Sequence, residues 1–254
     1  MKADRSRLVA GINPVIAALR ARAKDIQRLL VVEDTHNQRV RDIEHMARDA
    51  GISVVHTHRD HIEQLTGLES HQDVVAELGG QVSLDEAGLE ALLDGLDEAP
   101  LLLVLDGVTD PHNLGACLRT AEAAGVHAVI VPKDRAAGLT PAARKASAGA
   151  SEVLPLVQVT NLARTLRALK ERGIWLYGTS DRAESDLYGQ ELNGPLALVL
   201  GSEGEGLRRL TAETCDFLVK IPLHGAIESL NVSVAAGVCL FEIRRQRSRE
   251  GPRR

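Results

Sequence analysis

From Leu101 towards the C-terminus, short apolar runs alternate with amphipathic segments. The apolar runs predict strands over residues 101–106, 127–132, 153–157, 174–178, 196–201 and 217–222. The amphipathic segments predict helices over residues 114–124, 141–148, 161–172 and 230–247, the last with one face formed by Leu230, Val234, Val238 and Phe241. Strands that alternate with helices predict an α/β fold with a mainly parallel sheet and helices on both faces. We place this domain over residues 100–247.

A weaker version of the same pattern comes earlier in the chain. Asn13-Pro14 opens a helix with apolar periodicity, and residues 37–49 predict a second helix. Strands are predicted over residues 29–32 and 52–55. We therefore expect residues 1–78 to form a small α/β domain.

The segment between these two domains differs in composition from both. Residues 79–99 begin with two glycines and are acidic, which is typical of a linker. Either Ser83 or Asp85 is placed to cap a short helix within it. After the second domain, residues 248–254 form a short basic tail.

Composition narrows the class of protein. The chain has 254 residues, 44% of them hydrophobic, and no apolar run reaches the roughly 18 residues that a membrane span needs. The N-terminus lacks the apolar stretch of a secretory signal, so we expect a cytoplasmic protein. Three cysteines and nine histidines are scattered along the chain. They form neither a disulfide framework nor a metal-binding motif, so we expect no bound metal.

Charge and aromatic content bear on a nucleic-acid partner. The formal net charge is −5, which does not by itself indicate one. Arginines nevertheless gather near both ends of the chain, at Arg5, Arg7, Arg20, Arg22 and Arg28 and at Arg244, Arg245, Arg247, Arg249, Arg253 and Arg254. A solvated surface with a frayed tail and a set of phosphate contacts both explain these clusters. Aromatic residues make up 2% of the chain, so bound RNA would be held through phosphates, 2′-hydroxyls and base edges rather than by stacking.

Three segments rich in glycine and polar residues follow predicted strands, where ligands bind in sheets of this kind. The first spans residues 106–125. Asn113 stands where a helix N-cap is expected, and Arg119 lies further along that helix. Each has a plain structural explanation, since asparagine is a good N-cap and Arg119 is placed to pair with Glu122 at i,i+3.

The other two segments span residues 196–210 and 221–237. The first of them contains Gly201, Gly204 and Gly206, a spacing that matches neither a dinucleotide fingerprint nor a P-loop. Its Glu203 has no packing role in the pattern, and its structural alternative is to accept hydrogen bonds from amides at a helix start. In the last segment, Ser229 and Asn231 open the final helix, and capping is again the alternative.

Taken together, these segments resemble the motifs of the SpoU branch of the SPOUT RNA methyltransferases. The resemblance rests on three long strings in the family's order, DPHNLGACLRTAEAAGVHAVIVPKDRA, LVLGSEGEGLRRL and SLNVSVAAG. Near the N-terminus, GINPVIAAL (11–19) and HQDVVAEL (71–78) resemble the family's small, L30e-like substrate-binding domain. The family usually has glycine where Asp73 stands. If that position has a positive φ, aspartate is a tolerable but poorer substitute.

The resemblance implies an enzyme that uses S-adenosyl-L-methionine to methylate a ribose 2′-hydroxyl. Within the branch, the chain is most similar to enzymes that modify a guanosine of 23S ribosomal RNA. The resemblance also implies a C-terminal trefoil knot and a homodimer in which the partner chain completes each active site. Positions that match the family's cofactor-binding residues are Thr179, Gly201, Ile221, Pro222 and Leu230. Positions that match its catalytic residues are Asn113, Arg119, Glu203, Ser229 and Asn231.

The role of Arg119 needs a chemical argument, because the family often assigns the corresponding arginine as the base. A guanidinium stays charged in proteins. We therefore expect Arg119 to hold a substrate phosphate bidentately and to place the 2′-oxygen, with the proton leaving through that phosphate or a water. Glu203, Ser229 and Asn231 are then expected to shape the cofactor loop and to fix the ribose.

Three alternative functions stay open. One is the same chemistry on transfer RNA, which composition does not separate from ribosomal RNA. Another is an RNA-binding or ribosome-assembly protein that keeps the fold without catalysis, and the joint presence of the five catalytic positions disfavours it. The last is a dinucleotide-binding oxidoreductase, which the missing G-x-G-x-x-G motif disfavours.

Overall fold

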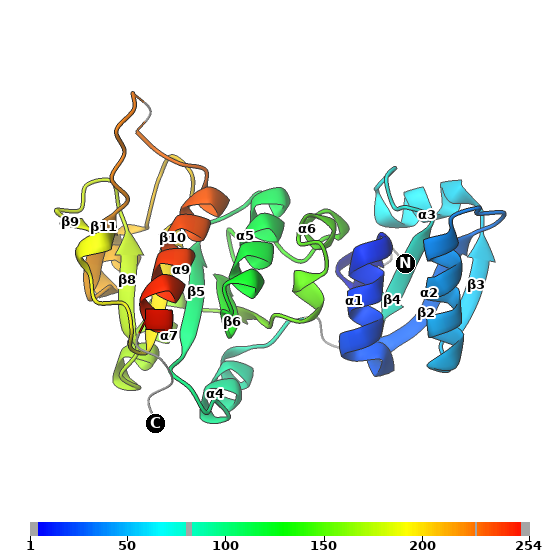
Figure 1. The fold of residues 1–254 in the computed structure, drawn as a ribbon, viewed down its shortest axis with the longest axis horizontal. Coiled ribbons are helices and arrows are strands. Elements are labelled where there is room, and N and C mark those ends of the chain that lie inside the picture. Colours follow the sequence, from blue (N-terminus) through cyan, green and yellow to red (C-terminus); the bar gives the residue numbers. More distant parts are fainter. Residues whose placement is uncertain (1–4, 80–82, 227, 250–254) are drawn as a thin grey trace.

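Two β-sheets organise the chain in the computed structural model, which describes residues 5–79, 83–226 and 228–249. A four-stranded sheet lies in the N-terminal part of the chain and a seven-stranded sheet in the rest. The two units sit side by side along the long axis of the molecule (Figure 1). Both combine strands with covering helices, so the predicted α/β class is confirmed. Among the described residues, no helix is long and apolar enough to cross a membrane.

The N-terminal sheet has the strand order β1-β4-β2-β3. β4 runs antiparallel to both of its neighbours, whereas β2 and β3 run parallel. One face packs against α1 and α2 around Val15 and Ile43, and the other covers Ile62 of α3. The sequence predicts α1, α2, β2 and β3 but not β1, α3 or β4. The elements are β1 Leu8–Ala10, α1 Ile12–Arg22, β2 Ile26–Val32, α2 Gln38–Asp49, β3 Ser53–Thr57, α3 Arg59–Thr66 and β4 Val74–Leu78.

The C-terminal sheet has the strand order β7-β6-β5-β10-β8-β11-β9, and every neighbouring pair is parallel. The predicted parallel sheet is therefore confirmed. Its strands are β5 Leu101–Asp106, β6 Ala128–Pro132, β7 Leu156–Val159, β8 Trp175–Thr179, β9 Ser185–Asp186, β10 Leu196–Gly201 and β11 Phe217–Lys220. The helices around it are α4 Glu86–Asp94, α5 Pro111–Ala123, α6 Pro141–Ala146, α7 Leu162–Glu171, α8 Arg209–Thr214 and α9 Val232–Arg249.

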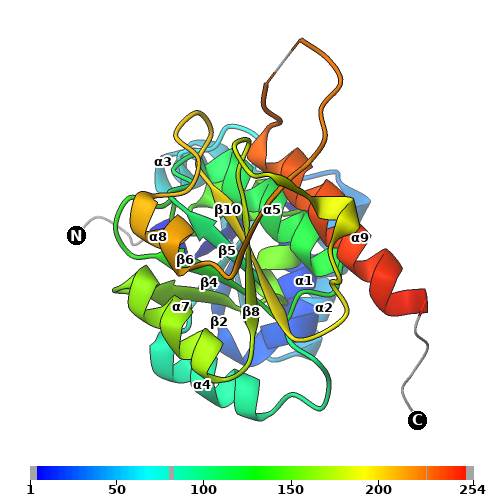
Figure 2. The same cartoon turned by 90° about the vertical axis from the view of Figure 1, so that its left-hand side faces the viewer.

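Helices cover both faces of this sheet, as the continuous apolar runs predict. Successive side chains of a strand point to opposite faces. Leu103 accordingly packs with residues of α5 and α9, whereas Leu102 and Val104 pack with residues of α4 and α7. Figure 2 shows α5 and α9 on one side of the sheet and α4, α7 and α8 on the other.

Several element bounds differ from the sequence prediction. The strand predicted over 153–157 is β7 at Leu156–Val159, because Ala150–Glu152 forms a 3-10 turn before it. The last helix starts at Val232 rather than at Leu230 and runs on to Arg249. Two short elements, α8 and β9, were not predicted at all. The short helix predicted after residue 83 is α4, and Asp85 caps it by accepting a hydrogen bond from the Gly88 amide at 2.9 Å.

Asp73 has a left-handed backbone. Its φ is +65°, so the condition stated for this position from the sequence is met. The side chain has partners that a glycine would lack. Thr35 Oγ1 donates to Asp73 Oδ2 at 3.0 Å, and the Arg59 guanidinium donates to Asp73 Oδ1. These bonds offset part of the strain that a residue with a Cβ meets at positive φ.

A buried charged cluster joins the two units. α6 packs against β1, and the 3-10 turn Ala150–Glu152 packs against α1. The side chains of Arg144 and Glu152 are both 0% exposed and form an ion pair. Arg144 also donates to the Ser6 carbonyl through Nη2 at 2.9 Å. A charge-assisted hydrogen bond from Arg144 of the larger unit to the backbone of Ser6 therefore connects it to the N-terminal unit.

Candidate active site

Four neighbouring parallel strands end at one edge of the larger sheet. β5, β10, β8 and β11 are consecutive in the sheet order. Gly201 at the end of β10 is in register with Asp106 at the end of β5, and Thr179 at the end of β8 is in register with Val219. The segments after β10 and β11 thus start from the same edge. Such an edge is where ligands bind in parallel sheets, and it holds the predicted cofactor positions Thr179, Gly201 and Ile221.

Asn113, Glu203 and Asn231 meet at this edge, although they are far apart in sequence. Asn231 donates through Nδ2 to Asn113 Oδ1 at 2.9 Å and also to Glu203 Oε1. The same Glu203 oxygen accepts a hydrogen bond from the Val232 amide at 3.2 Å. Asn231 Oδ1 in turn accepts from the Ser233 amide at 3.0 Å, which caps α9. Three of the five predicted catalytic residues therefore form one hydrogen-bonded cluster.

The structural alternatives for these residues have different outcomes. Asn113 is not the N-cap of its helix, because Asp110 takes that position and accepts from the His112 amide, with Pro111 at the first helical residue. The expectation for Asn113 as a cap is therefore wrong, and its side chain is free to meet Asn231. Capping does hold for Asn231, and Glu203 does accept from an amide at a helix start. Both residues combine that structural role with membership of the cluster.

The geometry of the loop after β10 requires its glycines. A Cβ on Gly201 would lie 2.0 Å from the carbonyl carbon of Gly206, so the loop folds back on the strand end too tightly for any side chain. The backbones of Ser202 and Gly206 exchange two hydrogen bonds, at 3.2 and 3.0 Å. Gly204 and Gly206 both have positive φ, a conformation that glycine adopts without strain. This tight turn presents Glu203 to Asn231.

Asp106 is a further residue of this edge, which the sequence prediction missed. It ends β5 and is 1% exposed. Its Oδ2 accepts from the Arg208 amide at 3.0 Å, and its Oδ1 lies 3.5 Å from Arg208 Nε without a hydrogen bond. Asp106 thus anchors the far end of the glycine-rich loop to the neighbouring strand. The signal in the sequence is an acidic residue that directly follows five apolar residues of a buried strand.

Arg119, Ser229 and Leu230 are not part of the cluster. All three are exposed. The Arg119 side chain makes no hydrogen bond or ion pair with the described residues, so the proposed pairing with Glu122 is absent. Pro222, like Ile221 before it, is half-buried beyond the end of β11. Arg119 therefore stands on the α5 surface with a guanidinium available to a ligand.

The Cys117 thiol, on which the charge of Glu203 acts, is not a nucleophile. Cys117 lies on α5 and is fully buried. Burial, together with the negative charge of Glu203, raises the pKa of the Cys117 thiol to about 12. The thiol is therefore protonated at neutral pH, and a protonated thiol is a poor nucleophile. Among the described residues, no group of three or more His, Cys, Asp or Glu side chains is placed to hold a metal ion.

Two family models match the chain, and together they cover most of it. The SpoU rRNA Methylase family matches residues 100–241. RNA 2′-O ribose methyltransferase substrate binding matches residues 8–80.

Similar sequences and structures agree with these matches. The 23S rRNA (guanosine-2′-O-)-methyltransferase RlmB of Ralstonia nicotianae is 52% identical over 248 residues, which cover 96% of this chain and 98% of that protein. RlmB of Escherichia coli is 47% identical over 243 residues, which cover 96% of this chain and 100% of that protein. The crystal structure of the SpoU methyltransferase AviRb from Streptomyces viridochromogenes, in complex with the cofactor AdoMet, has a TM-score of 0.80 and 27% identity, and it covers 95% of this chain and 90% of that one.

Proposed function

The chain belongs to the SpoU rRNA methylase family, and we propose that it transfers a methyl group from S-adenosyl-L-methionine to the ribose 2′-hydroxyl of a guanosine in 23S ribosomal RNA. The observation that carries the proposal is the cluster of Asn113, Glu203 and Asn231 at the ends of neighbouring parallel strands. Because 23S ribosomal RNA is the proposed substrate, the cytoplasm is the proposed compartment. Residues 1–78 would bind RNA, and residues 100–247 would carry the reaction.

The strand-end segments fit a cofactor that is held mainly through backbone groups. Between β11 and α9, the described residues 223–226 and 228–230 make no backbone–backbone hydrogen bond with the described chain. Their amides and carbonyls are therefore available to a ligand. Thr179 ends β8, which pairs with β11, and Gly201 ends β10, the next strand of the sheet. We assign Thr179, Gly201, Ile221, Pro222 and Leu230 to the cofactor. The C-terminal trefoil knot that the family resemblance implies stays a prediction.

The chemistry required of the protein is alignment and proton removal. S-adenosyl-L-methionine supplies a methyl group already activated on a sulfonium sulfur. Correct alignment of reacting groups is worth about 7–11 kcal/mol of barrier, and proton removal in the transition state adds about 10²- to 10⁴-fold in rate. Arg119 would hold a substrate phosphate through two parallel N–H bonds and thereby place the 2′-oxygen. Asn231, Asn113, Glu203 and Ser229 would fix the ribose beside the glycine-rich loop.

A second copy of the chain is the proposed partner of α9. One face of this helix is buried through Ala236, Leu240 and Ile243. The other carries Val234 and Phe241, which are 51% and 53% exposed. An exposed apolar stripe on a helix end that borders the site is typical of an interface, and a homodimer would cover it symmetrically.

The experiment that tests the proposal is methylation with labelled cofactor. The protein would be incubated with deproteinised 23S ribosomal RNA or with transfer RNA, and the modified nucleotide would be mapped. We expect one labelled 2′-O-methylguanosine in 23S RNA and none in transfer RNA. Label in transfer RNA instead of 23S RNA would show that transfer RNA is the substrate. Cofactor binding with no label in either RNA would overturn the catalytic proposal in favour of a non-catalytic RNA-binding protein.

A further inference from the structure

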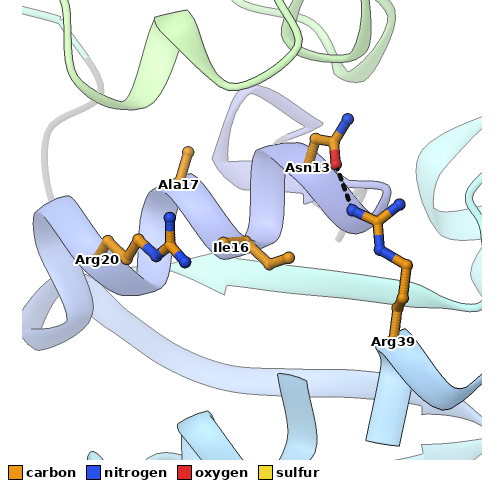
Figure 3. A pocket seen from close by; sticks show the side chains of 5 residues that line it. All are labelled: Asn13, Ile16, Ala17, Arg20 and Arg39. Carbon is orange, nitrogen blue, oxygen red and sulfur yellow. Dashed lines mark hydrogen bonds between the residues drawn. The ribbon is translucent and has the colours of Figure 1, made fainter. Parts of the chain in front are cut away.

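A groove along α1 carries positive charge without a neighbouring acid (Figure 3). It has a volume of about 340 Å³ and is lined by Asn13, Ile16, Ala17 and Arg20 of α1 and by Arg39 of α2. Both arginines are exposed. The groove contains no acidic side chain, so its field favours an anion.

The structure distinguishes this groove from the other arginine clusters. Most arginines of the two clusters named from the sequence are engaged within the protein. Arg28 pairs with Glu77, and Arg22 lies 3.4 Å from Asp25. At the other end of the chain, Arg245 pairs with Glu242, and Arg247 donates to the Pro100 and Gly194 carbonyls. The side chains of Arg249, Arg253 and Arg254 lie outside the described residues.

Arg20 and Arg39 differ from these arginines. The Arg20 guanidinium makes no hydrogen bond or ion pair with the described part of the chain. Arg39 donates through Nη2 to Asn13 Oδ1 at 2.8 Å, so a neutral amide orients its guanidinium and the charge is left uncompensated. An oriented guanidinium with free donors is suited to bidentate recognition of phosphate.

The length of the groove indicates a polymer rather than a single phosphate. Asn13 and Arg20 are two helical turns apart, which corresponds to about 10 Å along the axis of α1. A phosphate bound by Arg39 beside Asn13 and one bound by Arg20 would therefore be separate groups. Ile16 and Ala17 lie between them and offer an apolar floor to a sugar or base face.

The groove also lies next to the junction with the larger unit. A Cβ on Gly149 would lie 2.8 Å from the Ala17 side chain and 3.3 Å from the Asn13 carbonyl oxygen. The α1 surface is thus in direct contact with the segment between α6 and β7. An RNA strand bound in the groove would run along the junction between the two units.

We propose that this groove binds the sugar–phosphate backbone of the substrate RNA, with Arg39 and Arg20 as two phosphate contacts. The inference rests on the proposed function, because it takes RNA as the substrate. It assigns part of the RNA affinity to α1 and α2 and none of the methyl-transfer chemistry.

The test compares Arg20→Gln, Arg39→Gln and the double variant with wild type. RNA affinity would be measured on the full-length protein with deproteinised 23S RNA over a series of salt concentrations. Because each single-strand phosphate contact contributes about 0.7 to the slope of log K against log salt, we expect the double variant to lose about 1.4 from the slope and about tenfold in affinity. The KM for RNA should rise, while kcat at saturating RNA and the Kd for S-adenosyl-L-methionine stay unchanged.

Arg167→Gln is the matched control. Arg167 is also exposed and without a partner among the described residues, but its groove contains Glu171 and Glu213. We expect this variant to behave as wild type. Equal slopes for the double variant, the control and wild type would overturn the groove as an RNA site. Failure of wild type to methylate RNA would overturn the proposed function instead, since the slopes are measured without catalysis. If the double variant keeps the wild-type salt slope for RNA but loses affinity for inorganic phosphate, the groove is a small-anion site and the proposal is contradicted.

Discussion

Asn231 serves the helix and the candidate active site with different atoms. Its Oδ1 caps α9, whereas its Nδ2 reaches Asn113 and Glu203. The two functions can therefore be separated by substitution. Aspartate keeps the capping oxygens but has no Nδ2 donor, and alanine removes both groups.

We expect Asn231→Asp and Asn231→Ala to lose about 100-fold in kcat, because the ribose is no longer held in its reacting position. The loss of a cap in Asn231→Ala should cost only about 1 kcal/mol of unfolding free energy. Asn161→Ala is the control, since Asn161 caps α7 in the same way by accepting from the Arg164 amide at 3.0 Å. If Asn231→Ala loses no more activity than Asn161→Ala, Asn231 serves only as a helix cap.

Arg119 provides a test of phosphate positioning. The Arg119→Lys variant keeps the positive charge of Arg119, but a lysine holds a phosphate only as a point charge. We expect kcat to fall about tenfold or more, with the Kd for S-adenosyl-L-methionine unchanged. Steady-state kinetics with saturating RNA measures this effect. A variant that keeps nearly full kcat would rule out the bidentate role.

His71 links the stability of the N-terminal unit to pH. It is fully buried, and its Nδ1 accepts from the Asp73 amide at 3.1 Å. Burial, assisted by the positive charge of Arg59, lowers the pKa of His71 below its usual 6.5. The unfolded chain therefore binds a proton more readily than the folded one, so stability falls as pH drops below about 6.5. Urea unfolding from pH 7.5 to 5 should show this loss, and His71→Asn should show a smaller one.

At the scale of elements, α9 has two apolar faces with different partners. The face with Ala236 and Ile243 is buried, in a helix that packs against α5 and β10, and the face with Val234 and Phe241 is exposed in the single chain. Phe241→Glu should place a charge in the proposed dimer interface and yield a monomer. Light scattering after gel filtration measures the mass. Leu210→Glu is the control, because Leu210 is 47% exposed on α8, away from the stripe. A monomeric wild-type protein would contradict the proposed partner.

Sequence patterns were most informative for long elements of the larger unit. β5 and β10 were predicted because every residue up to the strand end is apolar and buried on both faces. β1 has three residues and α8 has six, so neither is long enough to establish a periodicity. The cap of α5 was misplaced because Asp110-Pro111 starts the helix one turn before Asn113.

The candidate site was less accessible to residue patterns alone. Asn113, Glu203 and Asn231 each had a plain structural explanation, and only the family resemblance placed them together. Their meeting depends on the order β5-β10-β8-β11, which no local pattern contains. Asp106 was missed for a similar reason, because an acidic residue after a strand is also typical of a turn.

At the scale of the whole molecule, the buried pair of Arg144 and Glu152 lies at the junction of the two units, where Arg144 donates to the Ser6 carbonyl and Arg22 lies 3.8 Å from Glu152. Glu152→Gln would leave the Arg144 guanidinium buried without its counter-charge, which costs about 3–5 kcal/mol. We expect calorimetry to show one unfolding transition for wild type and two for this variant. Glu213→Gln is the matched control, because its pair with Arg209 is exposed and an exposed pair contributes less than about 1 kcal/mol. Equal effects of the two substitutions would show that the junction is not held by this pair.

The bond between Asn113 and Asn231 spans 118 positions of the chain. During synthesis, α5 emerges long before α9, and the pairing of β5 with β10 is similarly distant in sequence. A nascent chain still attached to its ribosome lacks one side of the candidate active site until α9 has emerged. An enzyme made beside abundant ribosomal RNA would thus stay inactive until α9 has been synthesised, and stalled chains that end before Asn231 should methylate nothing.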